Sequence, residues 1–262
     1  MWNLFRSKAL LSKEDQRFQI DCYKWLLENF GGTKFYKDAK LILPTKEFFP
    51  SKVNSNESAA LTTFEQVKMH AGLQDWSCKL IAQKKDPNLV VAPTVVLNNF
   101  KQSPLGTFKG HKRRKKVKIT YNPEIVSDPI QMVATFAHEL SHYLTSTASD
   151  LPPGGKDNWE FATDICATFL GFGIFLANSA FNFSQYSSTG RGTQGWKTSR
   201  SGYLSEAEYS YALAIFLLLK DSPINSAYQY CDSNIKSCLK RALKEINNSD
   251  IIKELKLVEC KH

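Results

Sequence analysis

Apolar residues recur at helical spacing in the first part of the chain. The amphipathic pattern over residues 12–30 predicts a helix, and two glycines follow it directly. A second helix is expected over about residues 62–70, whereas the polar run 51–58 is typical of a loop. Residues 41–43 have the composition of a short strand. Residues 1–72 are therefore expected to form a helical N-terminal part.

The hydrophobic pattern changes from helical to strand-like spacing between residues 73 and 127. Val117–Tyr121 alternates strictly between apolar and polar residues, and Asn122-Pro123 ends it because proline cannot continue a strand ladder. We predict a small antiparallel sheet in this part of the chain. Its expected strands are residues 76–82, 93–97, 105–109 and 117–121.

Two helices are predicted over residues 128–181. Asp128 is a suitable N-cap for the first, with Pro129 at the first helical position. The sequence Pro-Pro-Gly-Gly at 152–155 then interrupts the chain, and a largely apolar helix is expected from Asn158 to about Ala180. The buried side of the first helix is expected to be Ile130, Val133, Ala137, Leu140 and Leu144.

Residues 182–262 are expected to form a mainly helical C-terminal part. An apolar helix is predicted from Glu206, and the apolar stripe over residues 235–246 is typical of a helix that packs on a core. The whole chain of 262 residues is long enough for one sizeable core. We therefore expect one α+β domain, with a small antiparallel sheet packed on the helix that begins after Asp128 and a mainly helical C-terminal half.

Charge adds one local feature. The formal net charge is +9, and much of the excess lies in the basic run 111–116. No aromatic residue interleaves with this run, which favours a solvated loop over a nucleic-acid-binding patch. We do not expect nucleic acid to be a partner.

The cysteines and the apolar segments point to a soluble, cytoplasmic protein. The six cysteines are scattered, with no C-x-x-C pair, which is typical of reduced thiols. The first residues contain no apolar run long enough for a signal peptide. The most apolar stretch, residues 165–181, contains glycines and is short for a membrane span, so a buried core helix is expected. The sequence does not specify an oligomeric state.

The chemically most specific segment is His138-Glu139-Leu140-Ser141-His142, an H-E-x-x-H motif. On a helix, two histidines four residues apart share one face and can bind one zinc ion. Glu139, between them, can take a proton from a metal-activated water. A pair of core histidines is the alternative, but it does not account for Glu139.

A catalytic zinc ion usually has a third protein ligand. No other histidine is suitably spaced, so a carboxylate after the Pro-Pro-Gly-Gly turn is expected. Glu160 lies in the first turn of the next helix, and Asp164 lies one turn further on the same face. We predict Glu160 as the third ligand and Asp164 as the acceptor for a ligand histidine, with the reverse assignment as the alternative. Asp150 and Asp157, in the intervening loop, are weaker candidates.

The motif followed by Glu160-x-x-x-Asp164 resembles the gluzincin pattern of zinc metallopeptidases. The segments W-E-F-A-T-D (159–164) and G-Y-L-S-E-A-E-Y-S-Y-A-L-A-I-F (202–216) also resemble an uncharacterised bacterial zincin-like family. The resemblance implies a zincin-like fold, a Zn²⁺ cofactor and a peptide or protein substrate. It also implies an edge strand that binds the substrate, formed by Val117, Lys118, Ile119, Thr120 and Tyr121.

The expected activity is zinc-dependent hydrolysis of peptide bonds with Glu139 as general base. A further donor is expected to stabilise the oxyanion, and the candidates are Tyr203, Tyr209, Tyr211 and Arg191. The alternative is a non-catalytic, zinc-stabilised protein-binding module. The intact Glu139 favours the enzyme, because a structural zinc site needs no base.

Overall fold

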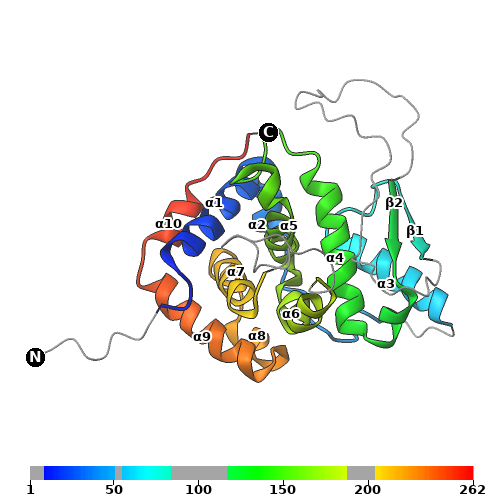
Figure 1. Cartoon of the computed structure of the whole chain (residues 1–262). Coiled ribbons are helices and arrows are strands. Elements are labelled where there is room, and N and C mark those ends of the chain that lie inside the picture. Colours follow the sequence, from blue (N-terminus) through cyan, green and yellow to red (C-terminus); the bar gives the residue numbers. More distant parts are fainter. Residues whose placement is uncertain (1–8, 51–54, 84–116, 188–203, 262) are drawn as a thin grey trace, which may run out of the picture.

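The computed structural model describes residues 9–50, 55–83, 117–187 and 204–261, and its described part is mostly helical, with two short strands (Figure 1). In chain order the main elements are α1 (Lys13–Phe30), α2 (Gly32–Asp38), α3 (Asn56–His70), β1 (Cys78–Ala82), β2 (Val117–Tyr121), α4 (Pro129–Thr145), α5 (Trp159–Ala167), α6 (Gly173–Ser187), α7 (Glu206–Leu219), α8 (Ile224–Tyr230), α9 (Ser233–Asn247) and α10 (Ile251–Lys256). Short 3₁₀ turns at Pro123–Ser127 and Gly155–Asn158 lead into α4 and α5.

The two described strands pair in parallel, so the predicted antiparallel sheet is wrong in direction. Cys78 lies opposite Val117 and Ala82 opposite Tyr121. A parallel pair needs a long crossover connection, and residues 83–116 supply one. Alternation of apolar and polar residues is a property of a single strand and does not specify whether the strand pairs in parallel or antiparallel, which is why the predicted direction was wrong. The expected strands at 93–97 and 105–109, and the basic run 111–116, lie outside the described residues.

Helix α4 lies between two groups of elements. The two strands and α3 cover one side, and α5, α6 and α7 lie on the other (Figure 1). The predicted start is confirmed, because Asp128 accepts a hydrogen bond from the Gln131 amide and Pro129 is the first helical residue. Tyr121 of β2 and Phe64 of α3 both pack edge-on against Phe136 of α4. These aromatic contacts anchor the helix that carries the H-E-x-x-H motif on the side of the strands and α3.

The long helix expected after Asn158 is interrupted. It begins at Trp159, one residue after the predicted start, and a π-helical turn over Thr168–Phe172 separates α5 from α6. Gly171 adopts a φ of 101°, and its carbonyl oxygen accepts a hydrogen bond from the Ile42 amide. A Cβ atom at this position would lie 2.0 Å from the Lys40 carbonyl oxygen. Residues 41–43 therefore contact this turn instead of forming the predicted short strand.

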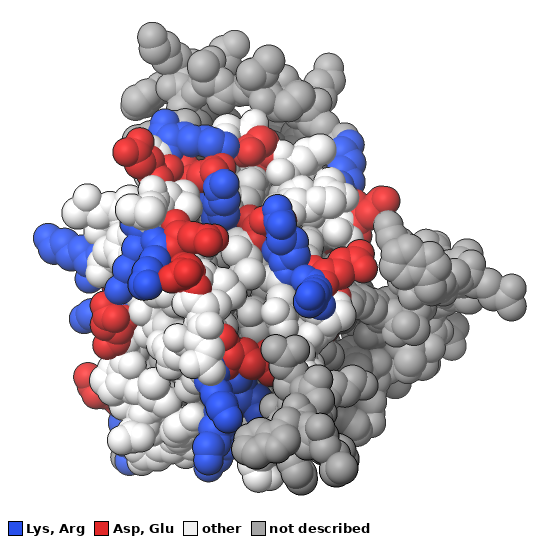
Figure 2. Space-filling model, turned by 90° about the vertical axis from the view of Figure 1, so that its left-hand side faces the viewer, with Lys and Arg blue, Asp and Glu red and all other residues white. Residues whose placement is uncertain are grey.

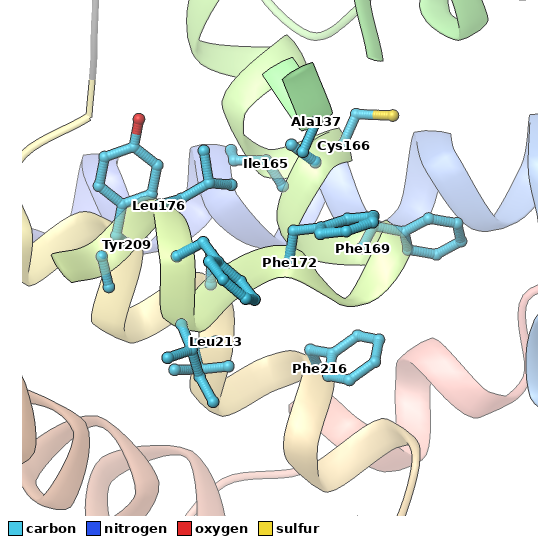
Figure 3. Packing of buried hydrophobic residues seen from close by; sticks show 14 of the residues in the cluster. Ala137, Ile165, Cys166, Phe169, Phe172, Leu176, Tyr209, Leu213 and Phe216 are labelled. Atoms are coloured by element: carbon cyan, nitrogen blue, oxygen red, sulfur yellow. The ribbon is translucent and has the colours of Figure 1, made fainter. Parts of the chain in front are cut away.

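The core below α4 is built mainly from α5, the π turn and α7. Phe169 and Phe172 lie between Ala137 of α4 and the side chains of Leu213 and Phe216 of α7 (Figure 3). Helix α7 is almost wholly buried, as its apolar sequence predicts, and a capping box between Ser205 and Glu208 begins it. The apolar stripe of α9 is also buried, which confirms its interpretation as core.

One helix begins earlier than predicted, and one helix was not predicted. Helix α3 starts at Asn56, several residues early, because the Ser55 hydroxyl caps the Ser58 amide. The polar run 51–58, which overlaps the start of this helix, was expected to be a loop throughout. Helix α8, over Ile224–Tyr230, was not predicted.

The apolar segment Gly155–Ala180 has the length and composition of a membrane span, but 83% of its most apolar window is buried within the protein. This burial is typical of the core helix of a soluble protein. On the molecular face that Figure 2 shows, acidic and basic side chains are interspersed. All six cysteines are free thiols.

Candidate metal centre

Helix α4 places His138 and His142 one turn apart on the same face. Their ring centroids are 4.7 Å apart and their planes are nearly perpendicular. The side chain of His138 is 1% exposed and that of His142 is 14% exposed. The two imidazoles are thus held in the interior, as expected for ligands that share one ion.

Helix α5 brings Glu160 to the same point. Its Oε2 atom lies 3.0 Å from Nε2 of His142 and 3.5 Å from Nε2 of His138. The ligand atoms of these three residues lie within 4.8 Å of one another, so the cluster could hold a metal ion. The Glu160 side chain is 51% exposed, so one side of the cluster meets solvent.

The turn between the two helices depends on glycine. Gly154 and Gly155 have φ values of 77° and 72°, in the left-handed region that favours glycine. A Cβ atom at position 154 would lie 2.0 Å from Nδ2 of Asn158, the residue that precedes α5. The Pro-Pro-Gly-Gly sequence therefore makes the reversal that returns Glu160 to α4, as the sequence predicts.

Asp164 supports His138 from behind. Its Oδ1 atom lies 2.8 Å from Nδ1 of His138, and its Oδ2 atom accepts a hydrogen bond of 3.1 Å from the Leu204 amide. With Nδ1 engaged in this way, Nε2 of His138 is the nitrogen left to bind a metal. Asp164 contacts Nδ1 of His138, whereas Glu160 lies near Nε2 of the same ring. The geometry therefore favours Glu160 as the metal ligand and Asp164 as the residue that orients His138, over an assignment in which Asp164 is the ligand.

Thr163 supports His142, and the sequence analysis missed it. Its Oγ1 atom lies 3.3 Å from Nδ1 of His142 and donates a hydrogen bond of 2.9 Å to the Trp159 carbonyl oxygen. The only available signal was position, because Thr163 is three residues after Glu160 and so lies on a neighbouring part of the same helical face.

Glu139 is fully buried beside the cluster. Neither of its carboxylate oxygens has a hydrogen-bond partner among the residues that the structure describes. Burial raises its pKa, the charge of His138 opposes the rise and the charge of Glu160 adds to it, and the net result is a pKa of about 7. A carboxylate with a pKa near neutrality is suited to accept and return a proton at physiological pH.

The protonation of His138, His142 and Glu160 depends on the contacts among these residues. Burial lowers the pKa of His138, but hydrogen bonds to Asp164 and Glu160 outweigh it and raise the pKa to about 10. Burial also lowers the pKa of His142, and the hydrogen bond to Glu160 opposes this only in part. Burial works against ionisation of Glu160, yet the two histidines hold its pKa well below its usual range. Glu160 is therefore ionised, as a carboxylate that binds a metal must be.

The donor set of the cluster fits zinc. Two imidazole nitrogens and one carboxylate oxygen leave one of four tetrahedral positions open, which is the arrangement of catalytic zinc sites. Both histidines have Nδ1 engaged, so both can coordinate through Nε2. The buried Glu139 carboxylate is close enough to His138 and Glu160 for their charges to affect its pKa.

The other predicted site residues fall into two groups. Tyr209 and Tyr211 are buried in the core on α7, and burial together with the charge of Glu245 raises the pKa of Tyr211 to about 12. In Figure 3 the Tyr209 hydroxyl points away from the labelled aromatic residues. Tyr203 and Arg191 lie outside the described residues.

The predicted substrate strand is present with the predicted bounds, as β2. Val117, Ile119 and Tyr121 are buried, whereas Lys118 is exposed and Thr120 is half-buried. One edge of the strand pairs with β1. Its role in binding a peptide stays a prediction.

Comparison with known proteins adds no relative. No protein family model matches the chain, and no curated protein and no solved structure matches it. The assignment of the site therefore depends on the geometry of His138, His142 and Glu160.

Proposed function

We propose that the protein is a zinc-dependent metallopeptidase of gluzincin type. The observation that carries the proposal is the buried Glu139 carboxylate, which interacts electrostatically with His138 and Glu160 and has no hydrogen-bond partner among the described residues. A buried carboxylate of this kind costs stability. A site whose metal only joins two helices has no use for it, whereas a hydrolase needs a base there.

Each residue of the site has a distinct part in the proposed reaction. His138, His142 and Glu160 would hold the zinc ion, which when bound lowers the pKa of a water molecule and polarises a substrate carbonyl. Glu139 would take a proton from the water at a carboxylate oxygen and deliver it to the leaving amine. Asp164 would keep the proton of His138 at Nδ1, so that Nε2 stays directed at the ion.

The proposal is tested by Glu139→Gln, which keeps the shape of the side chain and removes the base. Zinc content and peptide cleavage should be measured on the same preparations, with a peptide library as substrate. We expect about one zinc ion per chain in both proteins, and cleavage only by the wild type. Equal cleavage by Glu139→Gln would contradict the mechanism.

The same experiment distinguishes the alternative, a zinc-stabilised protein-binding module. This alternative has some structural basis, because the cluster joins α4 to α5. It predicts that the wild type binds zinc and cleaves no peptide, and that removal of zinc unfolds the protein.

A further inference from the structure

Four hydrogen bonds lie behind His142 and join α4 to α5, and they form a ring that is closed through the covalent structure of Trp159 and His142. Nδ1 of His142 lies 3.3 Å from Thr163 Oγ1, and this hydroxyl donates to the Trp159 carbonyl oxygen at 2.9 Å. The indole Nε1–H of Trp159 donates to Thr145 Oγ1 at 3.2 Å, and the Thr145 hydroxyl donates to the His142 carbonyl oxygen at 3.3 Å. The ring thus begins and ends at one candidate ligand.

The chemistry of the groups gives the ring one direction. An indole nitrogen only donates, a carbonyl only accepts, and each hydroxyl has one proton to give. The Thr163 proton goes to the Trp159 carbonyl, at the shorter of its two distances. The ring is complete when Nδ1 of His142 carries the fourth proton and Nε2 is bound to a cation. Every donor then has one acceptor.

The ring also restricts the position of Glu160, the candidate third ligand, because Trp159 immediately precedes it in α5. The indole is hydrogen-bonded to the last turn of α4 through Thr145, three residues after His142. Two of the four bonds, from Trp159 to Thr145 and from His142 to Thr163, cross between the helices and so influence the distance between His142 and Glu160.

We propose that Thr145, Trp159 and Thr163 are positioning residues that hold His142 and Glu160 at the spacing a single zinc ion requires. The proposal rests on the metal site of the proposed function and not on catalysis. It also assigns the two histidines different kinds of supporting residue. His138 is supported by the carboxylate of Asp164, which strengthens it as a ligand, whereas His142 is supported by a neutral hydroxyl, which only orients it.

The test is the affinity of the full chain for Zn²⁺ alone, measured by competition with a chromophoric chelator. Thr163→Val keeps the side-chain shape and removes the hydroxyl, and Thr145→Val breaks the ring at another point. We expect each to weaken zinc binding at least about tenfold, as is usual for lost partners of ligand histidines. Thr163→Ser restores the hydroxyl and should bind as the wild type does.

Thr168→Val is the matched control. Thr168 is also buried, and its hydroxyl donates to the Asp164 carbonyl oxygen outside the ring. This variant should keep wild-type affinity. A visible spectrum of the Co²⁺-loaded proteins should change for Thr163→Val and not for Thr168→Val, because only the first alters the geometry of a ligand.

Three results would overturn the proposal: Thr163→Val with affinity within twofold of the wild type, Thr163→Ser as weak as Thr163→Val, or equal losses in Thr163→Val and Thr168→Val. A wild type that binds no zinc would overturn it together with the proposed function. A wild type that binds zinc but cleaves no peptide would contradict the proposed function alone.

Discussion

Asp164 and His138 form a buried pair in which the carboxylate Oδ1 lies 2.8 Å from the imidazole Nδ1, and both side chains are 1% exposed. A carboxylate in this position fixes the tautomer and orientation of the ring and makes it a stronger ligand. The pair is thus the firmer of the two supports of the candidate metal centre.

Asp164→Asn should weaken zinc binding about 10- to 100-fold, because the amide neither carries the charge nor fixes the ring as firmly. The measurement is chelator competition, with circular dichroism to verify folding. Asp157→Asn, in the exposed turn before α5, is the control and should bind zinc normally. Unchanged affinity in Asp164→Asn would contradict the assigned support.

Zinc itself should stabilise the fold, since the three ligand residues come together only in the folded chain. At a free zinc concentration one hundred times the dissociation constant, the free energy of unfolding should rise by about 2.7 kcal/mol. A chelator should reverse the rise. Glu160→Gln should abolish most of it at the same zinc concentration, and Glu124→Gln, in the turn before α4, should retain it. An undiminished rise in Glu160→Gln would exclude Glu160 as a ligand.

Gly171→Ala should destabilise the protein by at least about 2 kcal/mol, because alanine is strained at a φ of 101° and its Cβ would meet the Lys40 carbonyl oxygen. Gly72→Ala is the control for strain alone, since φ is 70° there and no atom lies within 4 Å of an added Cβ. Gly72→Ala should lower the free energy of unfolding by about 1–2 kcal/mol. Urea unfolding measures both, and equal losses would show that the contact with Lys40 is unimportant.

Asp150 should contribute stability that depends on pH. Partial burial opposes its ionisation, but hydrogen bonds from Asn29, Lys261 and Ser149 outweigh this and lower its pKa. The ionised form is therefore favoured in the folded chain. The resulting stability is present above the unfolded-state pKa of about 4 and is lost as the pH falls through the lower folded-state pKa.

The comparison that isolates this contribution is Asp150→Asn against the wild type, both with chelator present. The variant should be less stable at pH 7 by at most about 1 kcal/mol, because the side chain is half exposed. The difference should shrink below about pH 4. A difference that stays constant from pH 7 to pH 3 would show that the charge is not responsible.

The candidate site was predictable because local spacing determines most of it. The four-residue separation of His138 and His142, the cap at Asp128 and the glycine turn before Glu160 each act within a few residues. Thr163 was missed, although its position three residues after Glu160 places it on the side of α5 that faces the site.

The errors in the fold come from contacts between distant segments. The direction of β1 relative to β2 is not encoded in either strand alone. The break at Gly171 depends on the approach of Lys40 and Ile42, and the only sign of it in the local sequence is the glycine itself. The early start of α3 is a different kind of error, because its N-cap, Ser55, is a local signal within a polar run that is typical of a loop.

The hydrogen bond from the Leu204 amide to Asp164 spans 40 positions of sequence and has a consequence for a chain that is still being synthesised. His138, His142 and Glu160 leave the ribosome well before Leu204, so a nascent chain already holds all the candidate ligands while Asp164 lacks one of its two partners. The hydrogen bonds of Asp164 are complete only when Leu204, just before α7, has reached its folded position. Zinc affinity is therefore expected to increase late in folding, after the helices that carry the ligands have formed.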